Sequence, residues 1–332
     1  MQEISSLKAQ RIESNTNRNR GWRITSRDLD ILTAVYRHRF LTRQLVEWAF
    51  FSRDDGDFDQ RSSLAARRLQ VLYEAGYVQR LILPVLPGSG RSPAVYALGS
   101  RGADAVASHL GVDREKVEWQ PRHNRTTAFF MEHTLATARL WASLTAALRG
   151  TQFRIRRWAG EAELRRWEMR GYDRETTRMI PIRPDGYLHL DWPDNTFVAF
   201  FVEVDMGTET NARVERKLRA YQDLRRETAR GDLDMRNFHL LIVTSGHRRM
   251  ENLRHIASKA LSQNICFFAT LDDLHPARVL TQWRDTDNEH VHLTGFFEDD
   301  STEESHQVDV GEDDDDYHGG YYDDEDKETW LE

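Results

Sequence analysis

The sequence predicts an α+β protein with two folded parts, the second of them an α/β sheet domain, followed by a charged C-terminal tail. The chain has 332 residues, which is enough for about two domains of roughly 150 residues each. In residues 21–111, three segments with helical periodicity precede two short strand-like segments. Residues 151–285 alternate apolar strand-like runs with amphipathic helices, a pattern that favours a mixed sheet flanked by helices.

The charge is unevenly distributed along the chain. From Glu298 onward the sequence has 17 Asp and Glu residues and one Lys, which leaves 37 acidic and 45 basic residues before that point. A body with a charge of +8 therefore precedes a tail with a charge of −16. A basic body favours a polyanionic partner, although an arginine-rich soluble surface would give the same count.

The composition argues against a secreted or membrane protein. Residues 1–20 are polar and basic, and we expect a disordered basic arm there rather than a signal peptide. No segment approaches the ~20 apolar residues that span a bilayer. The single cysteine, Cys266, lies in an apolar run and is expected to be a core residue, and one cysteine allows no internal disulfide. We therefore expect a cytoplasmic protein.

The first folded part begins near Trp22. Thr25 or Ser26 can cap its first helix, and Gly76 is placed to end its third. The predicted elements, in sequence order, are helices over 25–36, 42–50 and 60–75, strands over 77–83 and 94–98, and a helix over 101–110.

Three helices followed by a β-hairpin is the order of a winged helix-turn-helix, whose third helix enters the major groove of DNA. On that helix, Leu64, Ala65, Leu69 and Leu72 are predicted to face inward. Arg and Gln side chains suit the edges of guanine and adenine, and Arg in the hairpin loop suits a phosphate. The candidate DNA-binding residues are Arg61, Ser63, Arg67, Arg68, Gln70 and Arg91. The alternative is a winged helix that binds another protein.

A linker and a long helix follow in residues 112–150. Pro121 stands among charged residues, and residues 126–148 have the apolar positions of a long helix. Glu132 and His133 are neighbours within it. Because adjacent positions on a helix point in different directions, we expect capping or packing roles for both rather than a shared metal site.

The second folded part contains a buried strand with two acidic residues. The predicted strands cover 153–162, 181–192, 197–205, 238–244 and 265–270, and the predicted helices cover 211–226 and 248–261. On the strand over 197–205, Phe201, Glu203 and Asp205 share one face. Two carboxylates on a buried strand are costly unless a cation pairs with them, so a divalent metal or a basic residue is expected beside them.

This arrangement resembles the restriction-endonuclease-like core, whose pattern is Pro-Asp, a spacer, and then Asp/Glu-any-Lys. Pro184-Asp185 and Glu203-Val-Asp205 stand in those places. The resemblance implies that Asp185 and Glu203 are ligands of Mg²⁺ or Mn²⁺ and that Glu161 is the upstream acid. Asp205, on the same strand face as Glu203, is the third candidate ligand. Carboxylates hold such ions, which polarise a phosphate and lower the pKa of an attacking water.

The chain departs from that pattern at Asp205, which stands where the lysine belongs. Lys217 on the next helix is the predicted substitute, and Tyr221 lies one turn further along the same face. Lys217 and Tyr221 are therefore candidate catalytic residues together with Glu161. The alternative is that Lys217 only neutralises Glu203 or Asp205 and that catalysis has been lost.

The motifs together resemble the replication-relaxation family of bacterial plasmids and mobile elements. The likeness covers about residues 24–270 and includes the following segments: Arg67–Val78, Pro93–Leu98, Glu132–Leu135, Trp158–Glu161, Pro184–Gly186, Glu203–Glu209 and Lys217–Tyr221. It implies a protein that binds double-stranded DNA and acts in plasmid replication and DNA relaxation, with a nuclease-like domain.

We therefore divide the chain into a disordered arm (1–20), a winged helix (21–111), a linker with a long helix (112–150), a nuclease-like domain (151–285) and a disordered acidic tail (286–332). The tail either keeps the protein soluble, competes with DNA for the basic body, or docks a replication protein through Trp330 and Leu331. Three functions stay open: a metal-dependent endonuclease or nickase, a non-catalytic DNA-binding replication factor, and a protein-interaction module.

Overall fold

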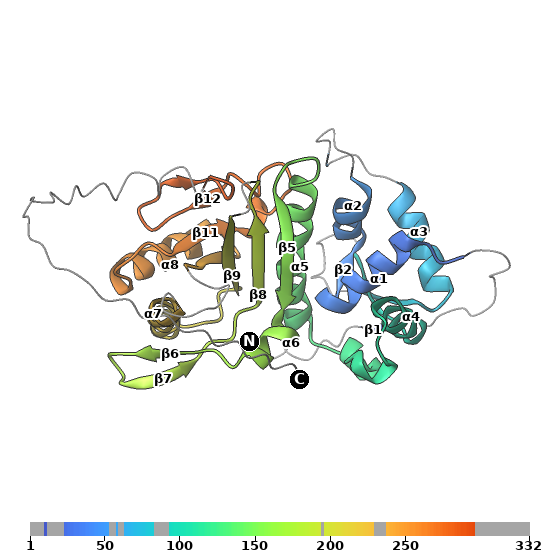
Figure 1. Ribbon diagram of the computed structural model, residues 1–332, viewed down its shortest axis with the longest axis horizontal. Coiled ribbons are helices and arrows are strands. Elements are labelled where there is room, and N and C mark those ends of the chain that lie inside the picture. The colour runs from blue at the N-terminus through green and yellow to red at the C-terminus, as the bar shows by residue number, and fades with distance from the viewer. Residues whose placement is uncertain are drawn as a thin grey trace, which may run out of the picture. The chain divides into compact units, whose positions relative to one another are not determined.

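The computed structural model describes residues 10–11, 23–52, 58, 63–82, 93–193, 196–228 and 237–295 (Figure 1). The chain divides into two compact units, Met1–Phe296 and Phe297–Glu332, and all described residues belong to the first. Two predicted DNA-binding residues, Arg61 and Arg91, lie outside the described residues. The acidic tail beyond residue 295 also lies outside them.

Three helices and a hairpin form the N-terminal part, in the order that the sequence predicts. The helices are α1 (Ser26–His38), α2 (Arg43–Phe51) and α3 (Ser63–Glu74), and the hairpin strands are β3 (Val78–Ile82) and β4 (Ala94–Leu98), followed by α4 (Ser100–Leu110). Two short strands complete an antiparallel sheet, because β2 (Leu41–Thr42) pairs with β4 and β1 (Gln10–Arg11) pairs with β3. Neither short strand was predicted, and β1 falls in the segment expected to be a disordered arm.

The ends of these helices follow from local side-chain chemistry. The Thr25 hydroxyl accepts a hydrogen bond from the Asp28 backbone N–H (3.3 Å), and the Asp28 carboxylate accepts one from the Thr25 backbone N–H (2.6 Å). This capping box satisfies two backbone donors at the start of α1. Gly76 ends α3 with φ +77°, a conformation that favours glycine, as predicted.

The N-terminal core lies between α1, α2, α3 and the hairpin. Ala65, Leu69 and Leu72 face this core, but Leu64 is 54% exposed, contrary to the prediction. At 3.6 residues per turn, Leu64 lies about 100° around the helix from the centre of that stripe, so it points to solvent.

The long helix α5 (Ala128–Ala147) packs on both folded parts. Its Ala138, Ala142 and Ala146 belong to the N-terminal core, while Ala136, Leu140 and Leu144 belong to the core of the second sheet. Residues 112–150 were predicted as a linker with a long helix, and this helix is a shared packing element. The Arg149 guanidinium beyond its C-terminus also donates to the Ala49 carbonyl of α2 at 2.6 Å.

A seven-stranded mixed sheet forms the centre of the second part and confirms the mixed-sheet prediction. The strands are β5 (Arg154–Gly160), β8 (Gly186–Asp191), β9 (Phe197–Asp205), β10 (His239–Thr244), β11 (Cys266–Thr270), β12 (Trp283–Arg284) and β13 (His290–Val291). Their spatial order is β13-β12-β11-β10-β9-β8-β5. The β5–β8 and β8–β9 pairs are antiparallel, whereas β9, β10 and β11 run parallel.

Helices cover both faces of this sheet. On one face lie α7 (Asn211–Thr228) and α8 (His247–Ala260), and on the other lies α5 (Figure 1). Because β9 is buried on both faces of the sheet, its side chains are mostly apolar on both faces, which explains the apolar run at Phe197–Asp205. Cys266 is buried in β11, as predicted.

Two features of this part were not predicted. A separate hairpin, β6 (Arg170–Asp173) with β7 (Arg178–Pro181), follows the short helix α6 (Glu161–Leu164), and β7 takes the first residue of the strand predicted over 181–192. The sheet also continues past residue 285, where the tail was expected to begin. Val291 pairs with Trp283, and Leu293 is fully buried, because these apolar side chains extend the core.

Candidate functional site

The centre of the candidate site is the carboxylate of Glu203 in β9. Glu203 is buried, and two side chains of α7 contact it: the Lys217 Nζ donates to Oε2 at 2.6 Å, and the Tyr221 hydroxyl donates to Oε1. Burial raises the pKa of Glu203 to about 7; the positive charge of Lys217 opposes this shift, and the negative charge of Asp185 adds to it. The sequence predicted this cluster, because Lys217 and Tyr221 lie one turn apart on one helix face.

Lys217 keeps its charge in this environment. Burial by itself lowers the pKa of a lysine, but the carboxylates of Glu203 and Glu209 outweigh burial and raise the pKa of Lys217 above its ordinary value. The Glu209 Oε2 lies 3.7 Å from Nζ. Burial and the Glu203 charge also raise the pKa of Tyr221, so its hydroxyl remains a proton donor to the carboxylate.

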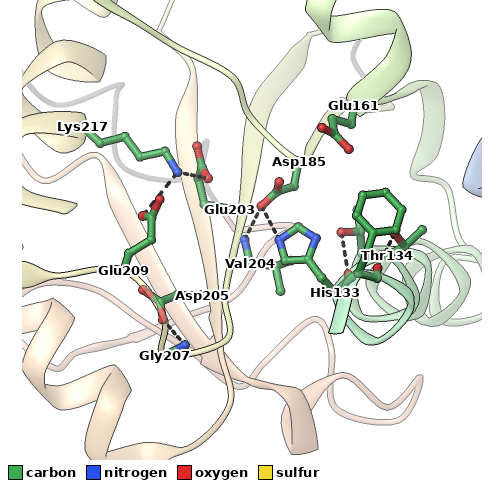
Figure 2. A network of polar contacts seen from close by, with 12 residues as sticks. His133, Thr134, Glu161, Asp185, Glu203, Val204, Asp205, Gly207, Glu209 and Lys217 are labelled. Carbon is green, nitrogen blue, oxygen red and sulfur yellow. Dashed lines mark hydrogen bonds and ion pairs between the residues drawn. The ribbon is translucent and has the colours of Figure 1, made fainter. Parts of the chain in front are cut away.

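Asp185 lies at the turn that leads into β8, and a histidine from α5 meets it (Figure 2). The Asp185 Oδ2 accepts a hydrogen bond from the Val204 backbone N–H at 2.8 Å and lies 3.3 Å from the His133 Nε2. Burial lowers the pKa of His133, but the Asp185 carboxylate outweighs it and raises that pKa above its ordinary value.

His133 is one of two site residues that sequence reasoning missed. A packing or capping role was predicted for it, because its helix neighbour Glu132 points elsewhere. The sequence contains no local signal that α5 crosses the sheet beside Asp185, since that contact depends on how α5 packs between the two folded parts.

Asp205 pairs with a different cation from the one that contacts Glu203. The Arg249 guanidinium of α8 pairs with both carboxylate oxygens, at 2.7 Å to Oδ2 and 3.2 Å to Oδ1. Asp205 also accepts a hydrogen bond from the Gly207 backbone N–H at 2.6 Å. Arg249 further donates to the Glu209 carbonyl at 2.8 Å, so Asp205 and Arg249 together fix the loop after β9. Arg249 was also missed by sequence reasoning.

Glu161, the predicted upstream acid, begins α6 near this cluster. Its carboxylate pairs with Arg165 at 2.5 Å and its side chain is 41% exposed. Figure 2 shows Glu161 on the side of Asp185 that also faces His133. Its charge contributes to the raised pKa of His133. Glu161 therefore acts on the site through electrostatics and contacts neither Glu203 nor Lys217.

The predicted metal ligands do not form a closed cage among the described residues. Within the described ranges, no group of three or more His, Cys, Asp and Glu side chains is arranged to hold a metal. Asp205 is committed to Arg249, which leaves Asp185 and Glu203. Two carboxylates fit Mg²⁺ or Mn²⁺, which commonly keep water and substrate phosphate as their other ligands. The side chain of Asp185 is 18% exposed and can meet such a ligand.

The third helix of the N-terminal part exposes most of its predicted DNA-binding residues. Ser63, Arg67 and Gln70 are exposed, and the Arg67 Nη2 donates to the Ser63 hydroxyl at 3.0 Å. Arg68 differs, because its guanidinium pairs with both carboxylate oxygens of Asp28, whose side chain is fully buried. Arg68 turns inward beside Leu69, so we assign it to the α1–α3 interface rather than to a DNA surface.

The comparisons with known proteins identify one family. The sequence model of the replication-relaxation family matches residues 32–236, which include Asp185, Glu203, Lys217 and Tyr221. Neither the curated proteins nor the solved structures give a match. No helix in the described part of the chain has the length and apolar character needed to cross a membrane. The match covers more than half of the chain, and the protein therefore belongs to the replication-relaxation family.

Proposed function

We propose that this protein is a plasmid or mobile-element replication protein that binds double-stranded DNA through a winged helix and cleaves a strand at a nuclease-like centre. The observation that carries the proposal is the contact between Lys217 and Glu203. Lys217 stands on α7 instead of β9, yet its Nζ lies 2.6 Å from the strand acid. This contact supports Lys217 as the substitute for the lysine that is missing from position 205.

The N-terminal part supports the DNA-binding half of the proposal. Its order is α1, β2, α2, α3, β3 and β4, with β2 paired to β4, which is the arrangement expected of a winged helix. Ser63, Arg67 and Gln70 form an exposed stripe on α3, the helix that would enter the major groove. Their side chains can donate hydrogen bonds to base edges and phosphates.

The second part supports the nuclease half. Asp185 precedes β8 and Glu203 lies in the neighbouring antiparallel β9, with the Asp185 carboxylate held by the Val204 backbone N–H. A bound Mg²⁺ or Mn²⁺ would polarise the scissile phosphate and lower the pKa of an attacking water. Asp185 and Glu203 would hold the ion.

The remaining residues position these acids and carry charge. Lys217 stays protonated and can stabilise the negative charge that develops on the phosphate oxygens. Tyr221 holds one Glu203 oxygen and His133 holds one Asp185 oxygen, so both carboxylates are fixed before substrate arrives.

A second candidate function is a non-catalytic DNA-binding replication factor built on an inactive nuclease fold. One observation favours it: each of three carboxylates already has a basic side chain beside it, since Asp185 meets His133, Glu203 meets Lys217 and Asp205 meets Arg249. Such pairing satisfies buried charge without a metal. The two functions share the DNA-binding step and differ in whether a strand is cut.

The DNA-binding step is tested by Arg67→Gln. We expect this variant to lose about 1–3 kcal/mol of binding free energy for duplex DNA, because an exposed arginine on the recognition helix would be removed. Arg157→Gln is the matched control, since Arg157 is also exposed but pairs with Glu163 at 2.6 Å. Fluorescence anisotropy with labelled plasmid fragments measures both. Equal affinity of Arg67→Gln and wild type would contradict the assignment of α3.

A further inference from the structure

The β6–β7 hairpin presents a second group of arginines. Arg170, Arg174 and Arg178 are exposed on the hairpin, and Arg183 is exposed just after it. None of these four guanidinium groups meets a carboxylate among the residues that the structure describes. Neighbouring arginines behave differently, because Arg157 and Arg166 pair with glutamates at 2.6 and 2.5 Å. The hairpin thus concentrates positive charge that no carboxylate in the described part of the chain neutralises.

An aromatic ring and an apolar side chain lie between these charges. Tyr172 and Met179 face each other across the hairpin ladder and are 37% and 50% exposed. Arg170 shares the exposed face of β6 with Tyr172, because side chains two residues apart point the same way. Arginine beside an exposed aromatic ring is a combination suited to nucleic acid, in which phosphates alternate with flat apolar surfaces.

The inner face of the hairpin is fixed to α7. Gly171 lies so close to this helix that a Cβ atom there would come 1.9 Å from the Ala220 carbonyl oxygen. The Asp173 carboxylate is buried and accepts from the Arg219 Nε at 3.1 Å, and the Asp223 carboxylate accepts from the Tyr172 backbone N–H at 2.7 Å. The arginines therefore project from a supported element rather than from a loose loop.

The hairpin also leads directly into the candidate nuclease centre. β7 ends at Pro181, Ile182 is buried, and Asp185 follows three residues later. The supporting helix α7 is the one that delivers Lys217 and Tyr221 to Glu203. Both connections of the hairpin therefore reach the same cluster of residues, one through the chain and one through packing.

We propose that the β6–β7 hairpin binds the phosphate backbone of DNA beside the nuclease-like centre, as a second contact separate from α3. The inference rests on the proposed DNA-binding function and adds a second surface to it. DNA is the occupant because an exposed cluster of arginines beside an aromatic ring favours a nucleic acid, and because the hairpin leads along the chain to Asp185, which is proposed to act on a phosphate. The outward face that carries Arg170 and Tyr172 is the one available to DNA.

The test compares two double variants that remove the same charge. Arg170→Gln/Arg174→Gln alters the hairpin, and Arg157→Gln/Arg166→Gln removes two exposed arginines that already have glutamate partners. Duplex affinity is measured by fluorescence anisotropy across a range of salt concentrations. Each lost phosphate contact lowers the slope of log affinity against log salt by about 0.9. We therefore expect a slope smaller by about two for the hairpin variant and a near wild-type slope for the control.

The outcomes separate this inference from the function on which it rests. A wild-type slope in the hairpin variant, with binding reduced in Arg67→Gln, would overturn the hairpin contact and leave DNA binding through α3 intact. An equal loss of slope in both double variants would also overturn it, since general charge would then explain the effect. If the wild-type protein binds no DNA, both the inference and the proposed function fail. Thermal unfolding of each variant verifies that the fold is retained.

Discussion

Replacing Lys217 with glutamine is expected to lower DNA strand cleavage by about 100-fold or more, the usual effect of losing a group that stabilises transition-state charge. The glutamine can still donate a hydrogen bond to Glu203, but it carries no positive charge. Binding of DNA through α3 is expected to be unchanged. Cleavage is measured by conversion of supercoiled plasmid, and binding by anisotropy on the same preparations.

Two further variants define what a loss of cleavage means. Lys217→Arg keeps the positive charge on α7 and is expected to recover part of the activity. Lys259→Gln is a matched control, because Lys259 is an exposed lysine near the C-terminal end of α8, ten residues after Arg249. Cleavage by Lys217→Gln at the wild-type rate would show that Lys217 serves only to neutralise Glu203.

Arg219→Ala is expected to lower the free energy of unfolding by about 3–5 kcal/mol, the usual cost of leaving a buried charge without its partner. The Asp173 side chain is fully buried, and that of Arg219 is only 15% exposed. Arg219 also pairs with Glu175 at 2.8 Å and with Glu215 at 2.7 Å. One substitution therefore removes the ion pair that joins Asp173 of the hairpin to α7.

Urea denaturation measures this effect against a surface pair. Arg166→Ala breaks the ion pair between Arg166 and Glu118, whose side chains are 61% and 60% exposed, respectively. This substitution should lower the free energy of unfolding by no more than about 1 kcal/mol. The double variant Arg219→Ala/Asp173→Ala should recover part of the lost stability, because no unpaired carboxylate would remain buried. Equal stability of Arg219→Ala and Arg166→Ala would show that the Asp173 pair does not anchor the hairpin.

Local patterns in the sequence were sufficient to predict much of the fold. Thr25 and Asp28 mark the start of α1 because a capping box is formed by residues three apart. The apolar run at Phe197–Asp205 indicated a strand buried on both faces, and it is one. The spacing of Lys217 and Tyr221 placed both on one face of α7, where they meet Glu203.

Contacts that depend on tertiary packing could not be predicted in the same way. His133 reaches Asp185 because α5 packs between the two folded parts, and Arg249 reaches Asp205 because α8 packs on β10 and β11 beside α7. Arg68 was predicted at a DNA surface because the helical pattern does not reveal that a buried Asp28 stands opposite. The strands of the β6–β7 hairpin have four residues each and are held by α7 rather than by an apolar pattern of their own.

The central claim, that the Asp185–Glu203–Lys217 cluster cleaves DNA, is tested most directly by incubating supercoiled plasmid with the protein and Mg²⁺ or Mn²⁺. Asp185→Asn, purified in parallel, removes one carboxylate charge and is the control for contaminating nucleases. We expect relaxed or linear plasmid from the wild type, and neither product from Asp185→Asn or after chelation of the metal, with DNA binding retained. Intact plasmid from a wild-type protein that binds it would contradict the claim and establish the non-catalytic DNA-binding factor instead.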